Sequence, residues 1–165
     1  MEKMFRVFLC LLAAVLFAGC GERMTHQEGT TMIANPWSTW DSIEEAESAV
    51  GFSFGLPDVI AGSYEAVSIC TMNDELIEVT YRDEDYEVCV RKKAGEGQDI
   101  SGDYHEYETC TETTCQGVAV VSYRNSNDPA VKQLVRAEGY SWSLVAPNGY
   151  WGDSSADFVN GILGE

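Results

Sequence analysis

Histidine is nearly absent from this chain, which has two histidines among its 165 residues. Ser/His/Asp and Cys/His catalytic sites both need a histidine, and no nucleophile-elbow sequence accompanies His105. The HExxH motif and paired CxxC motifs are missing as well, which excludes the common zinc sites. His26 lies in a segment without apolar periodicity, and we interpret His105 as an exposed strand residue. We therefore predict no metal, no cofactor and no enzymatic activity.

Basic residues are also scarce: 10 Lys and Arg stand against 27 Asp and Glu, for a formal net charge of −17. Binding to phosphates needs a basic stripe, so this composition excludes nucleic acid as a partner. It also excludes lying flat on an anionic membrane. The hydrophobic content of 45% and aromatic content of 11% are those of a globular fold.

An apolar run long enough to span a bilayer is missing too. The run Val7 to Phe17 is too short, and Lys3 and Arg6 precede it. A positive segment followed by such a run predicts a secretory signal peptide and hence export from the cytoplasm.

The end of this run, Phe17-Ala18-Gly19-Cys20, resembles the lipobox of bacterial lipoprotein signal peptides. Phe17 stands where that family usually has leucine. The resemblance implies a signal peptide over 1–19, a diacylglyceryl group on Cys20, and anchoring of the chain by acyl chains to the extracytoplasmic face of the membrane. An ordinary signal peptide followed by an incidental cysteine is the alternative.

The rest of the chain divides into a tether and one domain. Residues 20–34 have no period and few large apolar residues, so they are typical of a flexible lipidated tether. Asn35-Pro36-Trp37 marks the start of a single domain over 35–165, whose length suits one hydrophobic core.

The patterns of this domain predict an α+β fold: a mostly antiparallel sheet of a meander and hairpins, with an N-terminal and a C-terminal helix packed on one face. A capping box at Ser42 and Glu45 begins the first helix, 43–50, and Gly51 ends it. Ser154 is placed to cap the last helix, which carries Phe158, Val159, Ile162 and Leu163. Alternation and turn residues predict strands over 64–72, 76–81, 86–91, 104–110, 116–122, 131–137 and 140–146.

Four cysteines remain after the signal peptide and Cys20, and an exported chain with an even number of cysteines permits disulfides. Cys110 and Cys115 flank a four-residue stretch that a hairpin would close, so we favour this pair, which leaves Cys70 with Cys89. Free buried thiols are the alternative.

Several motifs of the domain resemble an uncharacterised domain family of extracytoplasmic lipoproteins and anti-sigma-factor-like membrane proteins in Gram-positive anaerobes. The resemblance covers 35–165 and implies an α+β fold and a surface location, with no functional residues to transfer. The motifs are Asn35-Pro36-Trp37, Glu44-Glu45-Ala46, Val50-Gly51-Phe52, Pro57, Gly62-Ser63-Tyr64 and Ile100-Ser101-Gly102-Asp103-Tyr104.

Four further clusters are candidate sites. Asp99 to Asp103 has oxygen ligands at alternate positions, as the first part of a calcium loop does, and Asp83-Glu84-Asp85 is a tight acidic run at a turn, but turn chemistry explains both. The basic cluster Arg91-Lys92-Lys93 is typical of a strand end. Tyr150 and Trp151, in a glycine-rich loop, form the one local feature that we nominate for recognition.

These features predict a non-enzymatic, membrane-anchored surface lipoprotein whose domain binds a ligand, senses it, or scaffolds the cell envelope, with an envelope protein or glycan as partner. The alternative is an extracytoplasmic hydrolase of envelope or glycan substrates that uses acidic residues.

Overall fold

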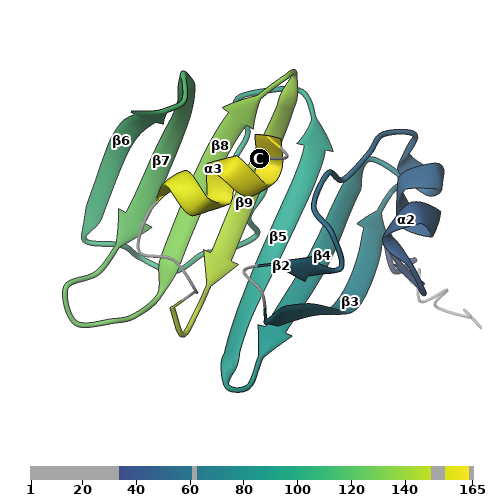
Figure 1. Ribbon diagram of the computed structural model, residues 1–165, viewed down its shortest axis with the longest axis horizontal. Helices are drawn as coiled ribbons and strands as arrows, with labels where there is room; N and C mark the ends of the chain where they lie inside the picture. The colour runs from purple at the N-terminus through teal and green to yellow at the C-terminus, as the bar shows by residue number, and fades with distance from the viewer. Residues whose placement is uncertain (1–33, 61–62, 150–154, 164–165) are drawn as a thin grey trace, which may run out of the picture. The chain divides into compact units, whose positions relative to one another are not determined.

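The computed structural model of the chain describes residues 34–60, 63–149 and 155–163, whose elements are drawn in Figure 1. The predicted signal peptide, Cys20, residues 20–33 of the predicted tether, and Tyr150 and Trp151 lie outside the described residues. Asn35–Glu165 forms one compact unit. Within the described ranges, no helix is both long and apolar enough to cross a membrane.

Helix α2 (Ile43–Val50) forms where the sequence predicts it, and the predicted capping box begins it. The Ser42 hydroxyl accepts a hydrogen bond from the Glu45 amide at 3.2 Å, and the Glu45 carboxylate accepts one from the Asp41 amide at 3.3 Å. These two bonds satisfy backbone donors that the first helical turn leaves without partners. Gly51 ends the helix in the left-handed conformation that glycine adopts at low cost, with φ of 79°.

Nine strands form one sheet in the order β1-β3-β4-β5-β9-β8-β7-β6, with β2 paired to β3 off this path. All strand pairs are antiparallel, and a second helix, α3 (Ser155–Leu163), follows the last strand. The prediction of a mostly antiparallel sheet with two helices is therefore confirmed. The strands are β1 (Trp37–Trp40), β2 (Val59–Ile60), β3 (Tyr64–Met72), β4 (Leu76–Asp83), β5 (Tyr86–Ala94), β6 (Thr109–Cys115), β7 (Val118–Arg124), β8 (Val131–Ala137) and β9 (Tyr140–Ala146).

Strands close together in the sequence form two sets, and one long-range pairing joins them. The first set is β3–β4–β5, and the second is β6–β7–β8–β9. Strand β5 pairs with β9 in a register that places Val90 opposite Leu144 and Lys92 opposite Trp142. The continuous sheet of Figure 1 therefore depends on the pairing of β5 with β9, which is the last strand in the sequence.

One face of the sheet carries the hydrophobic core. Val79 of β4 lies opposite Val90 of β5, which lies opposite Leu144 of β9, and all three side chains are fully buried. Residues directly opposite each other point to the same face, so these side chains form a continuous apolar layer. Both helices contribute to the same cluster, through Ile43, Ala46 and Val159.

Strand β6 corrects the prediction of a strand over 104–110 followed by a loop. The stretch Thr-Glu-Thr-Thr at 111–114 lies within the strand, because β-branched threonine favours an extended backbone. The turn falls instead at Gln116-Gly117, whose φ values of 50° and 81° are those of a two-residue hairpin turn. Residues 104–107 are outside any strand.

Candidate functional site

A long loop, 95–108, connects β5 to β6 and is fastened to the sheet by two basic side chains. Arg91 and Lys132 alternate with core residues along β5 and β8, so they point away from the core. Arg91 donates to the Ile100 carbonyl at 3.0 Å and pairs with Glu78 at 2.6 Å. Lys132 pairs with Asp99 at 3.2 Å. These contacts hold the loop against the sheet face opposite the core.

Gly102 shows how closely the loop approaches Arg91. Its φ of +63° is left-handed, and a Cβ atom built there would collide with the Arg91 guanidinium. Glycine therefore suits the backbone conformation of this position and lets the loop approach the Arg91 guanidinium as it is placed by Glu78 and the Ile100 carbonyl.

Two tyrosine rings contact Lys132, and one of them, Tyr107, belongs to the end of the loop. The Lys132 ammonium lies 4.5 Å from the centre of the Tyr123 ring and 5.4 Å from that of Tyr107, and Lys132 is 7% exposed. The Tyr107 hydroxyl donates to the Asp103 carboxylate at 2.8 Å. Burial, together with the bond to Asp103, raises the pKa of Tyr107, so this hydroxyl keeps its proton and acts as a donor.

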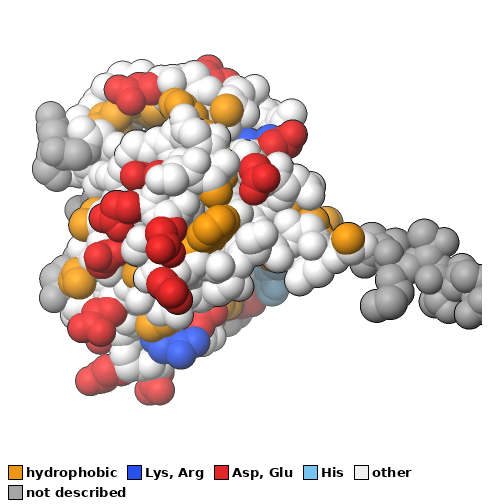
Figure 2. Space-filling view, turned by 90° about the vertical axis from the view of Figure 1, so that its right-hand side faces the viewer, with side chains coloured by type: hydrophobic (Ala, Val, Ile, Leu, Met, Phe, Trp, Pro, Cys, Tyr) orange, Lys and Arg blue, Asp and Glu red, His pale blue; other side chains and the backbone are white. Residues whose placement is uncertain are grey.

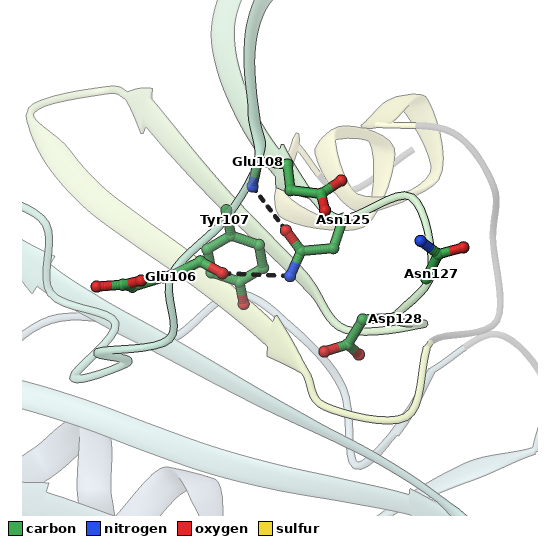
Figure 3. A pocket seen from close by; sticks show the side chains of 6 residues that line it. All are labelled: Glu106, Tyr107, Glu108, Asn125, Asn127 and Asp128. Carbon is green, nitrogen blue, oxygen red and sulfur yellow. Dashed lines mark hydrogen bonds between the residues drawn. The ribbon is translucent and has the colours of Figure 1, made fainter.

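An open pocket of about 350 Å³, which we call the loop pocket, lies between this segment and the turn that follows β7 (Figure 3). It has no Lys or Arg, and no Ser, Thr or Cys that would act as a nucleophile. Its lining residues are Glu106, Tyr107, Glu108, Asn125, Asn127 and Asp128.

Asn125 joins the two walls of the loop pocket. Its side-chain oxygen accepts from the Glu108 amide at 2.6 Å, and its nitrogen donates to the Glu106 carbonyl at 3.2 Å (Figure 3). These two bonds determine which end of the amide is nitrogen. The Glu108 carboxylate in return accepts from the Ser126 amide at 2.9 Å, which lowers the pKa of Glu108.

His105 and Asp128 meet at the edge of the loop pocket. His105 Nε2 lies 3.2 Å from Asp128 Oδ2 and 3.0 Å from Asn125 Nδ2. Neutral Nε2 accepts from the amide, whereas protonated Nε2 donates to the carboxylate. The interpretation of His105 as a strand residue is wrong, because it lies in the loop and its ring contacts Tyr107. Its partners follow it by about twenty residues, and no local pattern of the sequence signals them.

The chemistry available in the loop pocket is that of hydrogen-bond acceptance and negative charge. Glu108 and Asp128 each accept a backbone amide, and Asp128 also contacts His105. Carboxylates in this arrangement suit an ammonium or guanidinium group.

The carboxylates of Asp99 and Asp103, which are candidate calcium ligands by their spacing, bind backbone amides of their own loop. Asp99 accepts from the Ser101 amide at 2.9 Å, and Asp103 accepts from the His105 amide at 3.0 Å. Burial acts to raise the pKa of Asp99, but the bonds from Ser101 and Lys132 outweigh it and lower the pKa. Among the described residues, no group of His, Cys, Asp and Glu has the arrangement of a metal site.

The predicted disulfides are not formed: the four cysteines of the described part of the chain are free thiols. Cys110 and Cys115 lie five positions apart on extended β6, which places them too far apart for a bond and on opposite faces. Cys70 and Cys89 lie on β3 and β5, which are separated by β4, so their Cα atoms also exceed disulfide range.

The basic cluster of β5 is not a solvated strand end. Lys92 is 8% exposed, lies on the core face opposite Trp142, and donates to the Ser53 carbonyl at 2.5 Å. Its ammonium lies 4.3 Å from the centre of the Tyr140 ring and 4.5 Å from that of Trp142. Burial lowers the pKa of Lys92. The cation thus fixes the segment that follows α2.

A second surface hollow, of about 530 Å³, lies along α2. Its lining residues are Trp40, Glu44, Glu45, Ser48 and Ala49. The Trp40 indole donates to the Thr71 hydroxyl at 3.0 Å, which fixes the ring at the sheet edge. Figure 2 shows this side of the molecule, where acidic side chains surround hydrophobic ones.

No protein-family model, curated protein sequence or solved structure matches this chain. The resemblance to the uncharacterised domain family stays a prediction.

Proposed function

We propose that the chain is a non-enzymatic lipoprotein of the bacterial envelope, held on the extracytoplasmic face of the membrane by acyl chains on Cys20. Its domain over 35–165 binds or senses an extracytoplasmic ligand, or scaffolds an envelope complex. The observation that carries the proposal is the run Val7 to Phe17 followed by Ala18-Gly19-Cys20. Membership of the uncharacterised domain family belongs to the same proposal.

The site geometry favours binding over hydrolysis. A hydrolase that uses two carboxyl groups needs one of them protonated, to act as an acid. In the loop pocket the Ser126 amide instead lowers the pKa of Glu108, and Asp128 accepts the Ala130 amide and contacts His105. These carboxylates are better suited to attracting a cationic group than to donating a proton.

We also infer that α2 and α3 cover the same face of the sheet. Ile43 and Ala46 of α2 and Val159 of α3 belong to one cluster with the core residues of β4, β5 and β9. This arrangement supports a binding role at the sheet edges and on the loop-covered face, since the helices occupy the other face.

The test is the intact mass of the protein extracted from its native membrane. We expect a chain that begins at Cys20 and carries acyl chains, and we expect Cys20→Ser to abolish both processing and acylation. Cys10→Ser is the matched control: residue 10 lies in the removed segment 1–19, so we expect the lipidated mature mass to equal that of the wild type. A mature chain without lipid would contradict the anchor and describe a freely secreted protein.

A further inference from the structure

The outer edge of β6 is an unpaired sheet edge. In the described part of the chain, β6 pairs with β7 alone and ends the strand order (Figure 1). Six of its seven residues are exposed, and Cys115 is half-buried. An exposed edge of this length is a template for another strand, and proteins usually shorten or cover such edges.

The hairpin register shows which backbone groups of β6 face outward. In a two-residue hairpin, Cys115 and Val118 next to the turn exchange hydrogen bonds, and hydrogen-bonded pairs then alternate along the ladder. The carbonyls of Val120 and Arg124 accept from the hydroxyls of Thr113 and Thr109, so both carbonyls face β6, as they do in hydrogen-bonded pairs.

The amides and carbonyls that point away from β7 are therefore those of the intervening residues: Cys110, Glu112 and Thr114. Backbone polar groups in such a row are the ones that a partner strand pairs with.

The charge around this edge specifies the chemistry of a partner. Glu112 lies at the middle of β6 and is its one charged residue, and the one basic residue of β7, Arg124, lies opposite Thr109 at the start of β6. The acidic loop pocket adjoins the start of the strand, because Glu108 lines the pocket and Thr109 begins β6. A second copy of the chain suits this edge poorly, since the register that overlaps all of β6 places Glu112 opposite itself.

We propose that β6 binds an extended, basic segment of an extracytoplasmic partner protein as an added strand. A Lys or Arg side chain of that segment lies opposite Glu112, and another enters the loop pocket beside Glu108 and Asp128. Main-chain hydrogen bonds to Cys110, Glu112 and Thr114 provide the affinity, and the carboxylates provide the selection for basic sequences. This inference rests on the proposed function, because it names the class of partner that the domain binds.

The test uses the mature lipidated protein in detergent and a fluorescent, end-capped heptapeptide of alternating lysine and valine. We expect the peptide to bind and to slow hydrogen exchange at the amides of Cys110, Glu112 and Thr114. A glutamate–valine peptide is the charge control. A lysine–valine peptide that is N-methylated at every residue keeps its charge and loses all its backbone donors, so we expect it not to bind.

Two charge-reversal variants distinguish a local contact with Glu112 from general attraction of the basic peptide to the acidic protein. Glu112→Lys is expected to weaken binding of the lysine peptide about fivefold, the scale of one exposed ion pair. Asp85→Lys, in the exposed turn between β4 and β5, changes the net charge equally and is expected to leave binding within about twofold, since exposed charges beyond a Debye length are screened.

Equal weakening by both reversals, or undiminished binding of the N-methylated peptide, would overturn strand addition in favour of general charge attraction. Absence of binding, or dimerisation of the chain through β6, would overturn it as well. The intact mass of the same preparation distinguishes the two proposals. Lipidated protein that does not bind the peptide contradicts only this inference. Protein without lipid contradicts the membrane anchor.

Discussion

Strand β5, at the centre of the sheet, and strand β6, at its edge, use their polar groups in different ways. On β5, Arg91 pairs with Glu78 and holds the Ile100 carbonyl, while Lys92 holds the Ser53 carbonyl on the other face. On β6, Glu112 and its neighbours are exposed, and the strand pairs with β7 along one of its two edges. The centre therefore uses its charges to fix loops within the molecule, whereas the edge leaves its charge and its outward backbone groups exposed.

The largest difference is expected in thiol reactivity. Burial, together with the nearby Glu78, raises the pKa of Cys89 on β5 to about 12, whereas Cys110 on β6 is exposed. Since the thiolate is the reacting form, we expect iodoacetamide at neutral pH to modify Cys110 at least about a hundredfold faster than Cys89. Peptide mapping of the native protein measures both rates, and denatured protein is the control. Equal rates in the native protein would mean that the centre of the sheet opens as readily as its edge.

The second effect is on stability. Arg91→Met leaves the carboxylate of Glu78, which is 19% exposed, without its partner and removes one of the two basic side chains that fasten the 95–108 loop. We expect a loss of about 2 kcal/mol in the free energy of unfolding, between the values of exposed and buried pairs. Urea unfolding measures it, and hydrogen exchange should quicken over 96–108.

Arg82→Met is the matched control, because its pair with Glu87 is about half exposed on both sides. We expect it to cost less than about 0.5 kcal/mol. Similar losses for the two variants would show that Arg91 does not fasten the loop.

The third effect concerns Lys92. Methionine at this position keeps the ring contacts and removes the buried charge, so we expect Lys92→Met to cost only about 1 kcal/mol despite the lost bond to Ser53. Burial lowers the pKa of Lys92, so the unfolded chain binds more protons than the folded one at alkaline pH below about 10.5. The wild type should therefore gain stability relative to Lys92→Met as pH rises through that range. Urea unfolding at several alkaline pH values tests this, and an opposite slope would contradict it.

The smallest effect is expected at the edge. Glu112→Lys changes an exposed residue with no folded-state partner among the described residues, so the free energy of unfolding should change by less than about 0.5 kcal/mol. Thermal unfolding beside the wild type measures this. A large loss would mean that Glu112 serves the fold, and would remove the distinction between centre and edge.

The sequence predicts those parts of the fold that depend on neighbouring residues. The capping box at Ser42, the alternation along 76–81 and the turn at Glu138-Gly139 each act within a few positions, and the structure has an element at each. The strand over 109–115 was missed because a run of threonines between polar residues has no alternation to mark it.

The site could not be predicted in the same way. Asp128 and Asn125 reach His105 only after the chain has passed through a hairpin, and Lys92 becomes a core residue only because β9 supplies Tyr140 and Trp142. Such partners are fixed by the strand order, which local patterns do not contain. The free edge of β6 follows from the same order.

The pairing of β5 with β9 also bears on how the chain folds. Gly95 and Ser141, which are joined by a hydrogen bond across this junction, are 46 residues apart. Closing so long a loop costs entropy that hairpins avoid, so we expect β3–β5 and β6–β9 to form early and to meet in the slowest step. Until β9 pairs with β5, that strand has an open edge and Lys92 lacks the rings of Tyr140 and Trp142. The sheet thus becomes continuous only when β9, in the last quarter of the chain, has paired with β5.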